Sequence, residues 1–137
     1  YTGVERWEEA KAACEKVFGM GYSFMINNPK CKGIVIGETT IIGNNVMVSR
    51  NTFILDRNHR FDRVDIPIVQ QGFLQAKQTI IEDDCWIGLR CILTPGRHVS
   101  KGTIVAMGSV LTKDFPPFSV VGGAPAKFIK SRISKDD

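Results

Sequence analysis

Aliphatic residues recur at every sixth position in two stretches of the chain. In the first stretch they are Ile36, Ile42, Val48 and Ile54. In the second they are Ile81, Ile87, Leu93, Val99, Val105 and Leu111. A period of six is neither the 3.6-residue period of a helix nor an alternation sustained between hairpin turns. It predicts a solenoid, and therefore constrains the fold more than any other feature of the sequence.

Each hexapeptide is expected to form one short parallel strand and one corner, with the aliphatic residue inside the coil. Most residues two positions before these aliphatics are small or β-branched, which suits a tight corner: Thr40, Val46, Thr52, Thr79, Cys85, Cys91, Thr103 and Ser109. Arg97 is the exception. Three hexapeptides would close one coil of about 18 residues, and coils would stack at roughly 4.8 Å. The predicted fold is an all-β solenoid, a parallel β-helix.

The N-terminal end lacks the repeat. Residues 1–21 carry a capping box formed by Thr2 and Glu5, place apolar residues along one face and end near glycines. This pattern predicts an N-terminal amphipathic helix. Residues 22–132 are then expected to form the β-helix domain.

The C-terminal end also departs from the repeat. Pro116 and Pro117 follow the last hexapeptide, where a solenoid must stop growing or expose an edge. A short C-terminal helix is expected after Pro125, and residues 133–137 are expected to form a polar tail.

The two repeat stretches are out of register with each other. Ile81 follows Ile54 by 27 residues, which is not a multiple of six. The hydrophilic sequence between them is expected to leave the coil as a loop over about residues 56–78, and long loops on rigid scaffolds are often functional. The loop carries His59, which is either the functional residue or an ordinary surface side chain. The other histidine, His98, directly precedes a repeat aliphatic and is expected to face solvent.

Several motifs resemble those of the hexapeptide-repeat acyltransferases: DRNHRFDR, DIPI, QQGF, IEDDCWIG, ILTPG and AMGSVLTKDFPPFSVVGGAPAKFIK. The resemblance covers roughly residues 33–132. Within the family, the sequence is particularly similar to the maltose, galactoside and capsular-polysaccharide O-acetyltransferases. It implies that the β-helix is left-handed. It also implies an acyltransferase that moves an acetyl group from acetyl-CoA to a hydroxyl of a sugar or polysaccharide, with active sites between the subunits of a homotrimer.

His59 matches the catalytic base of that family. An imidazole with the ordinary pKa of about 6.5 can remove a proton from a sugar hydroxyl while the hydroxyl oxygen attacks a thioester. Asp56, Asn58 and Asp62 are candidates for holding the imidazole in one tautomer, or are simply solvated loop residues. Trp86 matches a tryptophan on the acceptor side of the family's site, or alternatively packs at a corner of the solenoid.

The resemblance also implies coenzyme contacts, at Gly88, Leu89, Met107, Thr112, Lys113, Lys127 and Lys130. Met107 stands where the family usually has alanine, and Leu89 where a small residue is frequent. If the contacts there use the backbone, these changes matter little; if they use side chains, the pantetheine channel is narrower. Lys127 and Lys130 belong to a basic segment that either holds the coenzyme phosphates or is a solvated end. Acetyl-CoA enters as the acyl donor, and no metal is required.

Composition agrees with one folded domain in the cytoplasm. A chain of 137 residues with 43% hydrophobic residues can form a single core. The four cysteines have no C-x-x-C spacing, so zinc and disulfides are not expected, and Cys85 and Cys91 fit buried corner positions. Neither a secretory segment nor an apolar run of the roughly 20 residues that a membrane helix needs is recognisable. The charge of +4 without interleaved aromatics disfavours nucleic acid.

Two other functions are compatible with a solenoid of this kind. A γ-class carbonic anhydrase needs three histidine ligands for each metal, which His59 and an outward-facing His98 do not supply. A non-catalytic assembly or scaffold module is the second alternative. An active transferase should release free thiol from acetyl-CoA when a sugar acceptor is added, and a scaffold should not.

Overall fold

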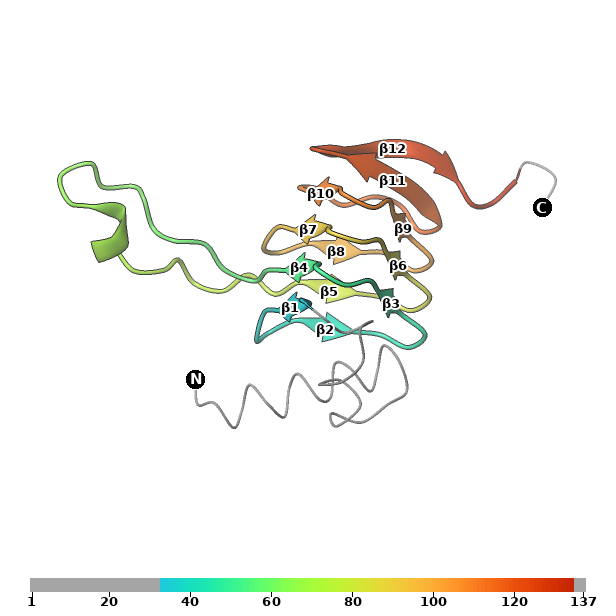
Figure 1. Ribbon diagram of the computed structural model, residues 1–137, viewed down its shortest axis with the longest axis horizontal. Coiled ribbons are helices and arrows are strands. Elements are labelled where there is room, and N and C mark those ends of the chain that lie inside the picture. The colour runs from blue at the N-terminus through green and yellow to red at the C-terminus, as the bar shows by residue number, and fades with distance from the viewer. Residues whose placement is uncertain (1–32, 135–137) are drawn as a thin grey trace.

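The computed structural model describes residues 33–134, which wind into a parallel β-helix (Figure 1). Ten two-residue strands form the coils: β1 (Val35–Ile36), β2 (Ile41–Ile42), β3 (Met47–Val48), β4 (Phe53–Ile54), β5 (Ile80–Ile81), β6 (Trp86–Ile87), β7 (Ile92–Leu93), β8 (His98–Val99), β9 (Ile104–Val105) and β10 (Val110–Leu111). Two longer strands follow, β11 (Ser119–Gly123) and β12 (Ala126–Ser131). The described chain contains one 3₁₀ helix, η2 (Ile68–Gln70), between β4 and β5. The helix expected over residues 1–21 lies outside the described residues.

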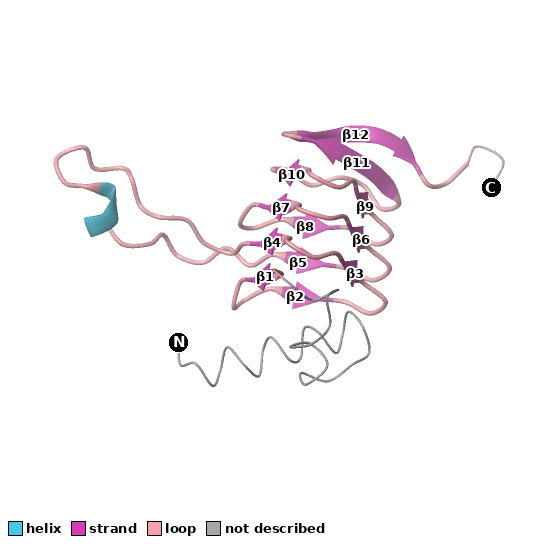
Figure 2. Ribbon diagram, in the orientation of Figure 1, coloured by secondary structure: helices cyan, strands magenta, loops and turns pink. Residues whose placement is uncertain are grey.

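The strands stack into three sheets, one on each side of the triangular coil (Figure 2). Their orders are β1-β4-β7-β10, β2-β5-β8 and β12-β11-β9-β6-β3. Partners in successive coils lie 18 residues apart, as Trp86 and Ile104 do. Across the interruption the spacing is 39, as between Ile41 and Ile80, so the loop inserts the difference of 21 residues. The parallel sheets fit the expected left-handed β-helix.

The residues of the six-residue repeat form the core. From Ile42 onward every one of them is at most 3% exposed, and Ile36 packs against this core from the first coil. Burying each such side chain contributes roughly 1.5–3 kcal/mol. Cys85 and Cys91 are buried at corners, and burial raises the pKa of the Cys85 thiol to about 11. The two thiols are therefore protonated packing residues at neutral pH.

The prediction of a short helix after Pro125 is wrong. The chain there forms β12, which pairs antiparallel with β11, for example Lys130 with Val120. β11 itself continues the sheet of β9 and so presents an unpaired edge. A strand satisfies the N–H and C=O groups of that edge, which a helix cannot do. No helix within residues 33–134 is long and apolar enough to cross a membrane.

Candidate active site

His59 lies on the loop that leaves the coil after β4 and returns to β5. In Figure 1 the loop extends to the left of the coil as two arms, with η2 near its far end. The arms pair antiparallel at His59 and Phe73. Two backbone hydrogen bonds flank this bridge: Arg60 N–H donates to Gly72 O at 2.9 Å, and Leu74 N–H donates to Asn58 O at 2.8 Å. His59 therefore has a defined place on a paired segment.

The imidazole of His59 stacks on the ring of Phe73. The ring centroids are 4.4 Å apart, and the planes meet at 28°. His59 is exposed, and no residue in the described part of the chain hydrogen-bonds its ring nitrogens. The stack fixes one face of the imidazole, and the unprotonated ring nitrogen can accept a proton from an incoming group while the other donates a hydrogen bond. Phe73 was not singled out from the sequence, because its pairing with His59 depends on the register of the two arms.

The three polar residues considered as partners of His59 all have other contacts. The carboxylate of Asp56 turns back into the coil and accepts hydrogen bonds from Thr39. The backbone carbonyl of Asn58 accepts from Leu74, as described above. The carboxylate of Asp62 forms a two-point ion pair with Arg60, whose hydrogen bonds lower the pKa of Asp62. Within one chain, stacking rather than a hydrogen bond orients the imidazole.

Three of the residues matched to coenzyme contacts meet at one corner of the coil. Gly88 follows β6, and its N–H donates to Val105 O at 2.9 Å. A Cβ at Gly88 would lie 2.6 Å from the backbone nitrogen of Met107, so the close approach of the two coils requires glycine. Leu89 accepts a backbone hydrogen bond from Gly108 at 2.7 Å, and the side chain of Met107 is 73% exposed. This corner is an open surface with tightly stacked backbone.

The other matched residues lie elsewhere on the same chain. Thr112 and Lys113 follow β10 at a different corner, where the Lys113 ammonium lies 5.6 Å from the centre of the Phe115 ring. Lys127 and Lys130 are exposed on β12, in the same sheet as β6 and β9. In Figure 1, β3, β6 and β9 of this sheet lie at the right, on the other side of the coil from the loop that carries His59, and β11 and β12 lie across the top.

Trp86 lies on the outer surface of β6. Its side chain is 46% exposed, and its neighbours across the sheet are Met47 and Ile104. It is therefore not a buried packing residue within one chain. Over residues 33–134, no group of three or more His, Cys, Asp and Glu side chains is arranged to hold a metal ion.

Comparison with known proteins places this architecture among acetyltransferases. The family model described as the hexapeptide repeat of succinyl-transferase matches residues 78–113. A chloramphenicol acetyltransferase of Agrobacterium fabrum is 42% identical over 65 residues, which are 47% of this chain and 31% of that protein. A probable macrolide acetyltransferase of Lysinibacillus sphaericus is 32% identical over 117 residues, covering 74% of this chain and 64% of that protein.

A solved structure shares the fold. The maltose O-acetyltransferase of Clostridium difficile 630 superposes with a TM-score of 0.60 at 29% identity, and the match covers 74% of this chain and 60% of that one. The chain thus spans about a third of the Agrobacterium protein and less than two thirds of the other two.

Proposed function

Because the chain belongs to the hexapeptide-repeat acyltransferase family, we propose that it transfers an acetyl group from acetyl-CoA to a hydroxyl of a sugar-type acceptor, with His59 as the general base. The relatives above are named for maltose, chloramphenicol and a macrolide. These compounds share hydroxyl groups, which supports O-acetylation. The observation that carries the proposal is the exposed His59 imidazole, held by Phe73 with its nitrogens unpaired in the described chain.

His59 supplies the proton transfer that the reaction needs. Its neutral imidazole removes the hydroxyl proton while the hydroxyl oxygen forms a bond to the thioester carbonyl carbon. The C–S bond then breaks, and the imidazolium returns the proton to the departing sulfur. No acyl-enzyme is formed, because the acceptor oxygen attacks the thioester directly. Such a base contributes about a hundredfold to ten-thousandfold to turnover.

The acyl donor is assigned to the corner that holds Gly88, Leu89 and Met107. Its open surface, on which the side chains of Leu89 and Met107 are exposed, suits a long, flexible pantetheine arm. Lys127 and Lys130 are assigned to the coenzyme phosphates, since exposed ammonium groups form charge-assisted hydrogen bonds with phosphate oxygens. Thr112 and Lys113 belong to the same proposal at the neighbouring corner.

A homotrimer would complete the site. The loop that carries His59 leaves the coil after β4 and extends to the left in Figure 1, whereas Gly88 follows β6, which lies at the right, so we infer that a loop from one subunit meets the corner of another. The loop and the sheet that contains β3 and β6 also expose apolar side chains that a neighbour would cover, such as Ile68 and Val69 on the loop and Met47 on β3. Trp86 would then line the acceptor side. Sedimentation at micromolar concentration should show a trimer, and a monomer would contradict the shared site.

The activity is tested by measuring free thiol released from acetyl-CoA with a panel of mono- and oligosaccharides, chloramphenicol and a macrolide. At least one hydroxyl-bearing acceptor should raise thiol release above the hydrolysis seen without acceptor, and the acetylated product should be recovered by mass spectrometry. Release that no acceptor stimulates would contradict the proposal. A product acetylated only at an amine would retain the transferase but overturn O-acetylation.

A further inference from the structure

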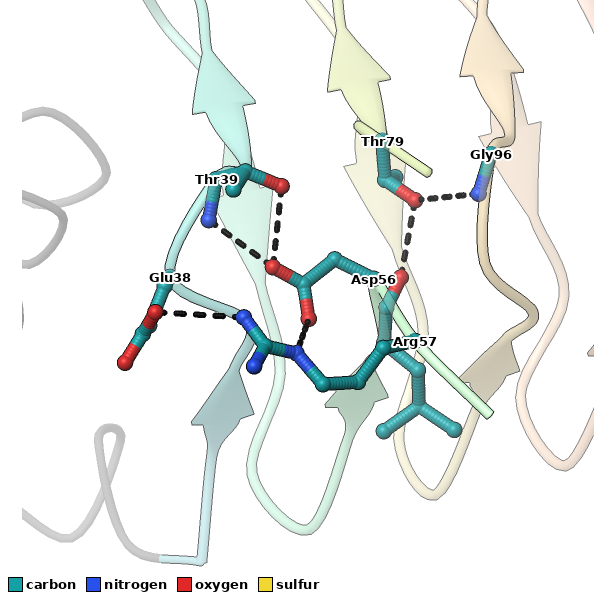
Figure 3. Close-up of polar contacts among 7 residues, drawn as sticks. Glu38, Thr39, Asp56, Arg57, Thr79 and Gly96 are labelled. Atoms are coloured by element: carbon teal, nitrogen blue, oxygen red, sulfur yellow. Dashed lines mark hydrogen bonds and ion pairs between the residues drawn. The ribbon is translucent and has the colours of Figure 1, made fainter. Parts of the chain in front are cut away.

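The loop that carries His59 is held at its root by a buried carboxylate. Asp56 is only 4% exposed, although it is charged and lies three residues before His59. One of its carboxylate oxygens accepts hydrogen bonds from both the backbone N–H and the hydroxyl of Thr39, each at 2.9 Å (Figure 3). Thr39 belongs to the preceding coil, between β1 and β2. Asp56 therefore ties the outgoing arm of the loop to the coil beneath it.

The coil is shaped to receive this carboxylate. A Cβ at Gly37 would lie 2.5 Å from the Asp56 carboxyl carbon, so only glycine leaves the space. The Arg57 guanidinium lies 3.5 Å from the second carboxylate oxygen and also binds Glu38 at 3.1 Å. Burial acts to raise the pKa of Asp56, but the two hydrogen bonds from Thr39 and the charge of Arg57 outweigh it, and the pKa is lowered. The carboxylate is ionised at neutral pH.

The returning arm is fastened to the same point. Lys77 N–H donates to the backbone carbonyl of Asp56 at 2.6 Å. The side-chain amide of Gln78 donates to the backbone carbonyl of Thr39 at 2.9 Å. Both arms of the loop thus meet at the Asp56–Thr39 contact.

The coil above contributes a further link. The hydroxyl of Thr79 donates to Leu55 O at 2.8 Å and accepts from Gly96 N–H at 3.2 Å (Figure 3). The root of the loop is therefore joined to the coils on both sides. The loop therefore leaves the coil from a root that is hydrogen-bonded on both arms.

A second corner of the coil has a similar contact without a loop. Asp83 also stands two residues after a core aliphatic, and its carboxylate accepts from Asn44 N–H at 2.7 Å. A Cβ at Gly43 would lie 2.4 Å from that carboxylate, as at Gly37 beside Asp56. The chain continues directly into the next strand after Asp83. Asp83 is exposed whereas Asp56 is buried, and it serves as a control for the contact between coils because it joins two coils and directs no loop.

We propose that Asp56 is a positioning residue for His59, which fixes the direction of the loop and hence the place of the imidazole. The inference rests on the proposed function, in which His59 is the general base. Asp56 acts through the arms of the loop, which start at its contact with Thr39 and pair with each other at the His59–Phe73 stack. Displacing a catalytic group by about 1 Å can cost roughly a hundredfold in rate.

The test compares turnover and acetyl-CoA binding in matched variants. Asp56→Ala and Thr39→Val should each lower kcat by about tenfold to a hundredfold, while the KM for acetyl-CoA stays within about twofold. Thr39→Ser keeps the backbone N–H and a hydroxyl and should restore most of the rate. Asp83→Ala should leave kcat within about twofold of wild type. Unchanged kcat in Asp56→Ala, or an equal loss in Asp83→Ala, would overturn the inference.

Amide hydrogen exchange makes the test independent of activity. Asp56→Ala should speed exchange of the Arg60 and Leu74 amides, which pair the arms, and Asp83→Ala should not. If the wild type shows no transfer to any acceptor, the proposed function fails. The exchange experiment still decides whether Asp56 holds the loop. If the wild type is active, and the Asp56→Ala variant shows neither faster amide exchange nor a lower kcat, Asp56 is not a positioning residue. Should Asp56→Ala not fold, Asp56→Asn is measured instead, since it keeps the side-chain volume and one acceptor oxygen.

Discussion

The coil and the loop of this chain are stabilised in opposite ways. In the coil, the second residue of each short strand points inward, and Ile54, the last before the loop, is completely buried. In the loop, Val64 is fully exposed, and the side-chain amide of Gln71 accepts a hydrogen bond from Arg63 N–H and donates one to Arg63 O. Hydrophobic burial therefore stabilises the coil, whereas a few local contacts define the loop. Loss of apolar volume should destabilise only the coil, and loss of a loop contact should mainly impair function.

His59→Ala should have the largest effect and should spare stability. Removing a general base lowers turnover by about two to four orders of magnitude. The free energy of unfolding should fall by no more than about 1.5 kcal/mol, because the side chain is exposed and its stack on Phe73 is the contact that is lost. The control is His98→Ala, whose exposed imidazole contacts Glu82 on a face of the coil. Turnover of His59→Ala above about a third of wild type, or an equal loss in His98→Ala, would remove His59 from the mechanism.

Leu93→Ala should show the reverse pattern. Leu93 is completely buried in the coil, and truncating such a side chain costs about 2–5 kcal/mol through lost burial and the cavity left behind. Val64→Ala on the loop should change stability by less than about 0.5 kcal/mol. Denaturant unfolding followed by circular dichroism at one fixed protein concentration measures both. Similar losses for the two variants would mean that the loop is packed as tightly as the coil in the assembled protein.

The same contrast explains how much of the fold could be predicted. The coil follows from a strict period, because each core position depends only on neighbours one coil away. The parallel strands and the buried repeat residues were therefore correctly predicted. The C-terminal strand was not, since β12 forms to pair the edge that β11 leaves open. Nothing in residues 126–131 alone indicates that edge.

The loop site was predictable only in part. Its sequence and position single out His59, but the contacts that hold this residue connect distant segments. Phe73 meets it across the paired arms, and Thr39 contacts Asp56 from the preceding coil. The 18-residue coil period would have placed Thr39 near the root of the loop, and that signal was not used. The Phe73 contact has no local sequence signal, because it depends on where the loop turns.

The exposed lysines of β12 should contribute to acetyl-CoA binding but not to the stability of the fold. Lys127→Ala combined with Lys130→Ala should weaken acetyl-CoA binding by about tenfold to a hundredfold, as expected for lost charge-assisted contacts. The loss should be smaller for 3′-dephospho-CoA and should shrink as salt screens the charges. Lys101→Ala, an exposed lysine at a corner of the coil, is the control. Equal losses of affinity for both ligands would indicate that the lysines contact the pyrophosphate rather than the 3′-phosphate. No loss for either ligand would indicate that the Gly88 corner alone binds the coenzyme.

Phe73→Leu should have the smallest effect on kcat. It tests whether the stack of Phe73 on His59 is what orients the imidazole. Leucine keeps apolar volume but removes the stack on His59, and such stacks contribute about 0.5–1.5 kcal/mol, so kcat should fall by about two- to tenfold. Phe73→Tyr keeps the ring and should retain the wild-type rate. Phe61→Leu alters an exposed phenylalanine of the same loop and should leave kcat unchanged. If Phe61→Leu and Phe73→Leu lower kcat equally, the loop depends on apolar area against a neighbouring subunit rather than on the stack. If only Phe73→Leu does so, with the KM for acetyl-CoA unchanged, the ring contact itself orients the base.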